Sequence, residues 1–427
     1  MSWLLTLALQ SLRNRRLTTV LTVASIGLSV ALLIGVEQIR TSARESFQGT
    51  ISQTDLIVGA RSGPVQLLLY SVFHMGSATA NISYDSYKKY RDHGAVKWTI
   101  PISLGDSHRG YRVVATNENF YQHYRFRGDR EVTFAKGEAA DGVFDVVLGS
   151  EVAAQLKYEL DKQLVLSHGM ASVGLLKHDD KPFRVVGILN RTGTPIDRAL
   201  YITLAGMEAI HIDWQSGAPP MFGEEVSADA INAMSKANPD ALAPKQITAF
   251  LLRTKSRVLT LRLQREVNTN EPEALLGIIP GVTLSELWQT IGYAESALLI
   301  VTGVVVLVGL LGMLMAIYTS LNERRREMAI LRSLGAGPRR IIALFVIEST
   351  LLSLLGCVVG VLLAYGAMLL AQPIVEDQLG LYLALRAPGA REFLYLGLVL
   401  VFGALRGLVP ALRAYRNALS DGLTIRV

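Results

Sequence analysis

Four long apolar stretches constrain this chain more than any other feature of its sequence. Residues 17–36 and 296–322 contain no charged side chain, whereas 341–372 and 393–412 contain one each, Glu348 and Arg406. A helix needs about 20 mainly apolar residues to cross the hydrocarbon core of a bilayer. We therefore expect an α-helical membrane protein with four transmembrane helices, one near the N-terminus and three near the C-terminus.

The first apolar stretch has an alternative interpretation as a signal peptide. Three arginines precede it, and residues 41–43 resemble a small-x-small cleavage site. However, the stretch is longer than the 7 to 15 residues of a signal h-region, and the charged Glu37 and Arg40 lie before the cleavage site. An uncleaved transmembrane helix fits the sequence better.

The basic residues outside the spans predict the orientation. With four crossings, all of the segments that they occupy fall on one side of the membrane, and the positive-inside bias makes that side the cytoplasm. Both termini are then inside. The arginines concerned are Arg13, Arg15, Arg16, Arg324, Arg325, Arg326, Arg332, Arg339, Arg340, Arg413, Arg416 and Arg426.

The segment between the first two spans is electrically balanced. Residues 40–290 carry 27 Lys+Arg and 27 Asp+Glu, so the whole net charge of +6 lies in the rest of the chain. The basic excess therefore reports membrane orientation, and we expect no nucleic-acid partner. We expect residues 1–39 to hold the N-terminal segment and first span, 40–284 to form a mixed α/β extracytoplasmic domain, and 285–427 to hold the other three spans.

The two charges inside the apolar stretches leave alternatives open. Glu348 is either an intramembrane partner or coupling element, or a helix-end carboxylate that reaches the interface, because an ionised group at the bilayer centre costs about 2.5 to 3.5 kcal/mol. Arg406 is expected to snorkel to the inner surface. Small residues four apart, among them Gly356 and Gly360, predict close helix packing within one chain or in a dimer.

The loop between the second and third spans, residues 322–340, is the most informative segment. It reads as a short amphipathic helix that glycine ends, followed by Pro338 at the first position of the next helix. Its apolar stripe could dock in a groove of a soluble partner or lie among lipid headgroups. The candidate coupling residues are Glu323, Arg324, Arg325, Arg326, Glu327, Met328, Leu331, Arg332, Leu334, Gly335 and Pro338.

The run ERRREMAILRSLGAGPRRIIALFVIEST closely resembles the signature of FtsX-like permeases of ABC transporters. The layout of one span, a large outer domain and three spans resembles the MacB-type group of this family. Residues 145–150, 183–189 and 193–197 also resemble its periplasmic core domain. Leu419 and Thr424 depart from the family's closing segment, where proline and arginine are usual.

The resemblance implies a function and partners. It implies a permease subunit in the bacterial inner membrane, a cytoplasmic ATPase dimer on the 322–340 loop, a second permease copy or homologue, and a periplasmic adaptor or lipoprotein. ATP and Mg²⁺ would be bound by the ATPase, and no cofactor by this chain. The substrate would be exported or extracted from the periplasm or outer leaflet. The alternatives are an FtsX-like signalling scaffold that controls a cell-wall hydrolase, and transport through a pore, which scarce intramembrane charge disfavours.

The outer segment has helix and strand patterns of its own. An apolar stripe continues past the first span to Ile51, and another leads from Leu284 into the second span, which predicts two helices that project from the bilayer. Thr283 or Ser285 is expected to cap the second. Strands are expected at 112–115, 146–148, 184–189, 199–202 and 247–252, helices at 83–91 and 151–158, and an insertion or mobile loop at 217–244.

No motif predicts an enzyme. The chain lacks GxxxxGK[ST], HExxH, GxSxG and a DxDxDG loop, so we expect no catalytic residue and no nucleotide hydrolysis by this chain. The single Cys357 excludes a disulfide framework. The histidines are His74, His93, His108, His123, His168, His178 and His211. Their spacing matches no ligand pattern, so no metal site is predicted, although imidazole suits zinc or copper.

Overall fold

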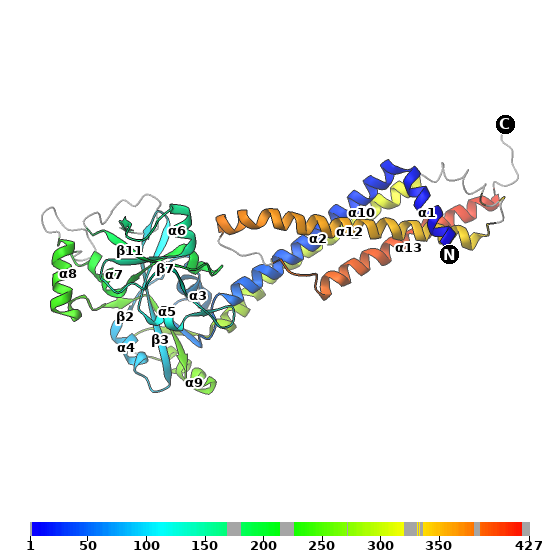
Figure 1. Cartoon of the computed structure of the whole chain (residues 1–427). Helices are drawn as coiled ribbons and strands as arrows, with labels where there is room; N and C mark the ends of the chain where they lie inside the picture. The colour runs from blue at the N-terminus through cyan, green and yellow to red at the C-terminus, as the bar shows by residue number, and fades with distance from the viewer. Residues whose placement is uncertain are drawn as a thin grey trace. The chain divides into compact units, whose positions relative to one another are not determined.

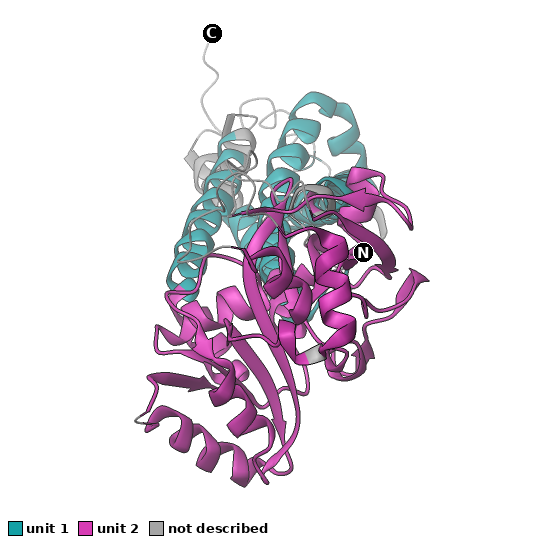
Figure 2. Ribbon diagram, turned by 90° about the vertical axis from the view of Figure 1, so that its left-hand side faces the viewer, with its two compact units in different colours: residues 1–42, 291–374, 383–427 teal, residues 43–290, 375–382 magenta. Residues whose placement is uncertain are grey.

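A computed structural model gives the fold of two compact units. It describes residues 2–168, 181–213, 226–270, 272–319, 331, 333, 336–379 and 385–420. We call residues 1–42, 291–374 and 383–427 the membrane unit, and residues 43–290 and 375–382 the core domain. Figure 2 distinguishes the two units by colour.

The membrane unit is built from long helices that run side by side (Figure 1). Its helices are α1 (Ser2–Asn14), α2 (Arg16–Gly49), α10 (Pro280–Thr319), α12 (Pro338–Leu379) and α13 (Ala390–Ser420). Among the described residues, three stretches are long and apolar enough to cross a membrane: Arg16–Gly49, Pro280–Gly309 and Arg339–Val375. Helix α13 covers the fourth predicted span, and the crossing itself stays a prediction.

Glycines bring the helices of the membrane unit close together. A Cβ atom on Gly360 of α12 would lie 2.6 Å from Val30 Cβ and 2.7 Å from the Gly27 carbonyl oxygen of α2. Gly309 of α10 similarly faces Ser29 of α2, where an added Cβ would lie 2.5 Å from the hydroxyl. Small residues therefore set these helix contacts, as membrane helices require where no hydrophobic driving force acts between them.

The core domain is a mixed sheet with helices on both faces. Its strand order is β15-β1-β14-β3-β4-β12-β8-β11-β7, with β10 paired to β3 and β9 to β11. The strands are β1 (Leu56–Ala60), β3 (Val96–His108), β4 (Tyr111–Thr116), β7 (Phe134–Gly137), β8 (Asp145–Leu148), β9 (Gln163–Leu164), β10 (Ser167–His168), β11 (Phe183–Leu189), β12 (Ala199–Thr203), β14 (Ala249–Thr254) and β15 (Leu275–Ile278).

Alternate residues of the strands contribute side chains to two apolar clusters, one on each face of this sheet. In β1, Val58 belongs to one cluster and its neighbour Ile57 to the other, because successive side chains point to opposite faces. Helices α4 (Tyr84–Arg91), α6 (Ser150–Leu156), α7 (Leu204–Ile210) and α9 (Arg257–Asn268) add buried side chains to the first cluster. Helices α3 (Pro64–Val72) and α5 (Asn119–His123) add to the second. Smaller elements are β2 (Ile82–Ser83), β5 (Arg125–Phe126), β6 (Arg130–Glu131), η1 (Pro195–Arg198) and β13 (Gln246–Ile247).

Four of the predicted strands and the two predicted helices of the outer segment are confirmed, each within a few residues. The strand predicted at 247–252 is divided between β13, which pairs with β2, and β14 of the main sheet. The prediction for residues 217–244 was wrong in part, because α8 (Ala228–Ala237) and the 3₁₀ helix η3 (Pro239–Leu242) lie there. Ser227 caps α8 by accepting a hydrogen bond from the Ala230 amide. The caps predicted at Thr283 and Ser285 were also wrong, since α10 begins at Pro280, where proline suits a first turn.

Helices α2 and α10 extend well beyond the length of a membrane span. They have 34 and 40 residues. At 1.5 Å per residue these are about 50 and 60 Å long, against a hydrocarbon core of about 30 Å. The prediction that both helices continue past their apolar stretches is confirmed.

Candidate functional sites

The predicted coupling loop lies largely outside the described residues. This applies to Glu323, Arg324, Arg325, Arg326, Glu327, Met328, Arg332, Leu334 and Gly335. Leu331 is described, and its carbonyl oxygen accepts a hydrogen bond of 2.9 Å from the Ala336 amide. Pro338 is the first residue of α12, as its position after the glycines predicted.

Glu348 faces protein. Its side chain is buried in α12 and accepts a hydrogen bond of 3.1 Å from the Ser11 hydroxyl of α1. This contact joins α1 to α12 and gives the buried carboxylate a polar partner. Arg406 lies on α13, and in the described part of the chain its Nη1 atom is buried without a hydrogen-bond partner.

A charged network joins three helices of the membrane unit. Arg40 donates to Glu37 Oε1 at 2.7 Å within α2 and to Glu295 Oε2 of α10 at 3.2 Å. Arg391 of α13 lies 3.6 Å from the same Glu37 oxygen. The Glu37 side chain is only 2% exposed, so Arg40 of α2 and Arg391 of α13 share one buried carboxylate, and Arg40 links it to Glu295 of α10.

A second set of contacts brings α12 into this network. The Gln38 side-chain nitrogen lies 3.0 Å from Tyr365 Oη of α12 and 3.2 Å from Glu392 Oε1 of α13. Glu392 in turn accepts a hydrogen bond of 2.9 Å from the Gly389 amide. The sequence did carry a signal for this site, because Glu37, Glu295 and Glu392 flank apolar stretches, but pairing among them could not be assigned from spacing.

A cavity of about 390 Å³ lies in the core domain beside the C-terminal turns of α2. Its lining includes Phe47, His74, Met75, Arg112 and Thr194. Burial, with the nearby Arg112 guanidinium, lowers the pKa of His74 to about 4. Arg112 donates a 2.6 Å hydrogen bond to the Gly76 carbonyl, and its Nε has no hydrogen-bond partner among the described residues.

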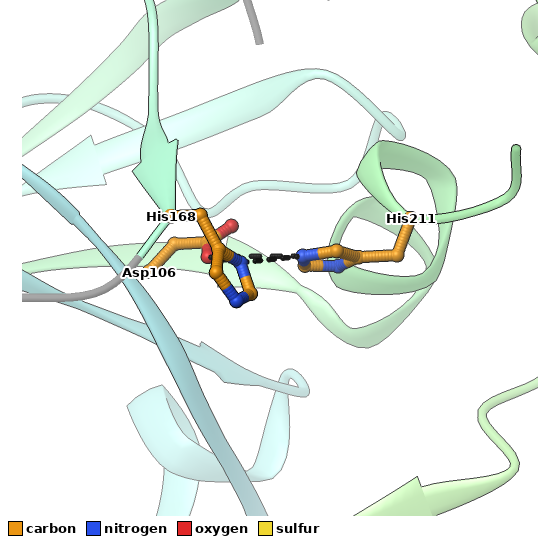
Figure 3. Close-up of side chains that lie close together, drawn as sticks. All are labelled: Asp106, His168 and His211. Carbon is orange, nitrogen blue, oxygen red and sulfur yellow. Dashed lines mark hydrogen bonds and ion pairs between the residues drawn. The ribbon is translucent and has the colours of Figure 1, made fainter. Parts of the chain in front are cut away.

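The histidines of the core domain differ in the contacts that their rings make. His108 is occupied at both ring nitrogens, by the Val165 carbonyl at 2.7 Å and by Tyr158 Oη at 3.1 Å. His123 stacks on Trp98, and His93 lies 3.6 Å from Glu266. His178 lies outside the described residues. His168 and His211 come together beside Asp106, as Figure 3 shows.

Asp106, His168 and His211 form a compact cluster, which we call the histidine cluster. His168 Nδ1 lies 3.2 Å from Asp106 Oδ1, and His211 Nε2 lies 3.3 Å from His168 Nδ1 and 3.7 Å from Asp106 Oδ1. Burial raises the pKa of Asp106 to about 6 and lowers that of His211. Spacing in the sequence did not reveal this cluster, because Asp106 lies 62 residues before His168, and His168 lies 43 residues before His211.

A buried ion pair supports the turn that follows α7. Lys181 Nζ lies 2.8 and 2.7 Å from the two carboxylate oxygens of Asp213, and the side chains are 1% and 3% exposed. Asp213 is two residues after His211, so the pair fixes the backbone that presents the histidine. No polar motif in the sequence pointed to this pair.

Comparison with known proteins gives two family matches. The family described as MacB-like periplasmic core domain matches residues 19–249. The family described as FtsX-like permease C-terminal matches residues 299–419. The two matches together take in most of the chain, and they fall on either side of the gap at 250–298.

Similar individual proteins were also found. An uncharacterised ABC transporter permease of Methanocaldococcus jannaschii is 28% identical over 241 residues, which cover 56% of this chain and 53% of that protein. The macrolide export ATP-binding/permease protein MacB of Rhodopirellula baltica is 22% identical over 395 residues, covering 83% of this chain and 53% of that protein. The chain thus spans about half the length of these two relatives. The solved periplasmic region of MacB from Actinobacillus actinomycetemcomitans aligns with 58% of this chain and 96% of its own at 11% identity, with a TM-score of 0.33.

Proposed function

The chain belongs to the MacB-like periplasmic core domain family, and we propose that this ABC transporter permease passes movement from a separate cytoplasmic ATPase to its own periplasmic domain. The observation that carries the proposal is the continuity of α2 and α10. Each helix runs without a break from an apolar stretch into residues of the core domain. A tilt at one end of a continuous helix therefore reaches the other end.

The proposed arrangement places the chain in the bacterial inner membrane with four crossings. The termini and residues 322–340 face the cytoplasm, and the core domain faces the periplasm. Two permease copies, or this chain with a homologue, pair with two ATPase subunits that dock on the 322–340 loop. A periplasmic adaptor or lipoprotein completes the assembly. ATP and Mg²⁺ belong to the ATPase, since this chain has no phosphate-binding loop motif.

The contacts around Glu37 and Gln38 connect the helices of the membrane unit, so a displacement of one helix is passed to its neighbours. Arg40 and Arg391 hold α2 and α13 to the buried Glu37 carboxylate, and Arg40 also pairs with Glu295 of α10. When ATP binding closes the ATPase dimer, displacement of α12 is passed through Gln38 and Tyr365 to α2. Cargo is taken from the periplasm or the outer leaflet and exported or extracted, without passing through a pore between the spans.

Uncoupling the loop tests the proposal directly. The chain is purified in nanodiscs with the ATPase that co-purifies with it, and ATP hydrolysis is measured for Glu327→Ala and Arg332→Ala. We expect stimulation of the ATPase to fall at least tenfold while membrane insertion is unchanged, because these residues are proposed to touch the ATPase. Arg13→Ala, which removes the same charge as Arg332→Ala but at a position outside the loop, serves as the matched control for that variant and should leave stimulation intact.

Two results would overturn this role. Full stimulation by both loop variants would remove the loop from the coupling path. Purification of the chain with a cell-wall hydrolase whose activity follows ATP turnover would favour the signalling alternative over transport.

A further inference from the structure

The fold places three metal-ligating side chains at one point of the core domain. Strands β3 and β10 are antiparallel, and their register sets His168 directly opposite Asp106. Side chains of such a cross-strand pair leave the sheet on the same face and approach within about 5 Å. His211 follows the last residue of α7 and reaches the same point from the helix end (Figure 3).

The separations match the edges of a metal coordination tetrahedron. Zinc binds imidazole nitrogen and carboxylate oxygen at about 2.0–2.1 Å in tetrahedral geometry, which places neighbouring ligand atoms about 3.3–3.4 Å apart. The observed ligand separations are 3.2, 3.3 and 3.7 Å. An ion at the centre of these atoms would need only a few tenths of an ångström of adjustment.

The ring of His211 is held in the state that a metal needs. Its Nδ1 lies 3.0 Å from the Met207 carbonyl oxygen, one helical turn earlier. A carbonyl accepts only, so Nδ1 carries the proton, and Nε2 presents a lone pair toward Asp106 and His168. Metal-ligating histidines are commonly oriented in this way, by donating the second ring N–H to a backbone carbonyl.

The surroundings suit a cation. The Asp106 side chain is 0% exposed and supplies the one formal negative charge of the cluster, while His168 is 46% exposed. Lys181, whose charge acts on His211, is paired with the Asp213 carboxylate by two contacts. Among the described residues, this is the one group of three such side chains close enough to share an ion.

We propose that Asp106, His168 and His211 bind one divalent transition-metal ion of the Zn²⁺ class, with a fourth coordination position open to water or another ligand. Two imidazoles and one carboxylate select zinc and its transition-metal neighbours over Mg²⁺ and Ca²⁺, which take mainly oxygen ligands. Three protein ligands leave one position open, as in zinc sites that are not purely structural. This site is distinct from the coupling role and does not depend on it.

The test uses the full, tag-free chain in nanodiscs, dialysed against Zn²⁺ and against Co²⁺. We expect one Zn²⁺ per chain by elemental analysis, and the visible absorption bands of low-symmetry, four-coordinate Co²⁺. His168→Gln and His211→Gln should each weaken Zn²⁺ binding at least tenfold and abolish the Co²⁺ bands. The matched control is His93→Gln, which removes a histidine that also lies near a carboxylate, Glu266, but belongs to no group of three ligands within the described part of the chain.

Folding is checked separately, because loss of binding could follow loss of structure. His168 is half exposed at the end of a two-residue strand, so His168→Gln should keep the unfolding temperature of the metal-free chain. Zn²⁺ should then raise the unfolding temperature of the unsubstituted chain and of His93→Gln, but not of His168→Gln. Equal binding by all three proteins would mean adventitious surface binding. No binding by the unsubstituted chain would mean a hydrogen-bonded cluster only. Either result overturns the proposal.

Discussion

The two units of this chain are stabilised in opposite ways. The core domain buries its large apolar side chains on both faces of a sheet, and a buried ion pair joins Lys181 to Asp213. In the membrane unit large apolar side chains stay exposed, such as Ile300 at 68% and Leu370 at 77%, while glycine and serine occupy helix contacts. Water drives the first arrangement, whereas close packing and hydrogen bonds must hold the second.

The difference is also visible between the helices of the membrane unit. Within the apolar stretch of α10 only 6% of the residues are buried, against 33% in α2 and 28% in α12. Helices α2 and α12 therefore form the centre of the unit, and α10 presents its apolar surface outward. Such a surface needs no burial within the chain when hydrocarbon surrounds it.

The largest expected effect comes from breaking the buried ion pair of the core domain. Lys181→Met leaves the Asp213 carboxylate buried without its partner, which should lower the free energy of unfolding by about 3–5 kcal/mol. Calorimetry of the full chain in detergent measures the change. The double variant Lys181→Met with Asp213→Leu should recover most of it. A loss in the double variant as large as in the single one would show that the pair itself, rather than an orphaned charge, matters.

Packing in the membrane unit should be nearly as sensitive. Gly360→Leu forces a side chain against Val30 and the Gly27 carbonyl, so α2 and α12 must separate at a cost of about 1–3 kcal/mol. The loss is measured as a lower unfolding temperature in detergent. Gly366→Leu is the matched control, because nothing lies within 4 Å of a Cβ there. Equal effects of the two substitutions would contradict packing through small residues.

Acid should weaken the core domain through His74. Its pKa is lowered to about 4 in the folded chain, against about 6.5 when unfolded, so the unfolded state binds the proton more readily. The stabilisation is complete above pH 6.5 and is lost as the pH falls toward 4. The separation of the two pKa values sets an upper limit of about 3 kcal/mol on this loss. Thermal unfolding across this range, compared with His74→Gln, isolates the contribution; parallel curves would exclude it.

A polar contact of the membrane unit should have the smallest effect. Gln38→Leu removes the contacts with Tyr365 and Glu392, yet hydrogen bonds between membrane helices average less than about 1 kcal/mol. The expected change in the free energy of unfolding is therefore about 1 kcal/mol, measured as for Gly360→Leu. A loss larger than that of Lys181→Met would reverse the comparison between the two units.

The sequence predicted local structure better than long-range contact. Apolar runs with β-branched or aromatic residues, such as 184–189 and 199–202, were recognisable as strands because they fit a pleated, buried surface. The order of strands was not predictable, since β12 lies between β4 and β8 although β9, β10 and β11 intervene in the chain. The helix at Ala228–Ala237 was missed because glycine and proline flank a short run of good helix formers.

The candidate sites show the same limit. Pro338 marked the start of α12 because its fixed φ suits a first helical turn. The histidine cluster could not be read from spacing, because it depends on the register of β3 with β10, which brings together residues far apart in sequence. The contacts of Glu37 likewise depend on which helices are neighbours.

Site-directed labelling tests the central claim most directly, namely that the core domain and the 322–340 loop lie on opposite sides of the membrane. In a Cys357→Ser background, Val258→Cys places a thiol at a position that is 79% exposed on α9, and Ser333→Cys places one in the loop. A membrane-impermeant maleimide added to intact spheroplasts should label Val258→Cys, and should label Ser333→Cys only after permeabilisation. Labelling of Ser333→Cys in intact spheroplasts, with Val258→Cys protected, would contradict the account.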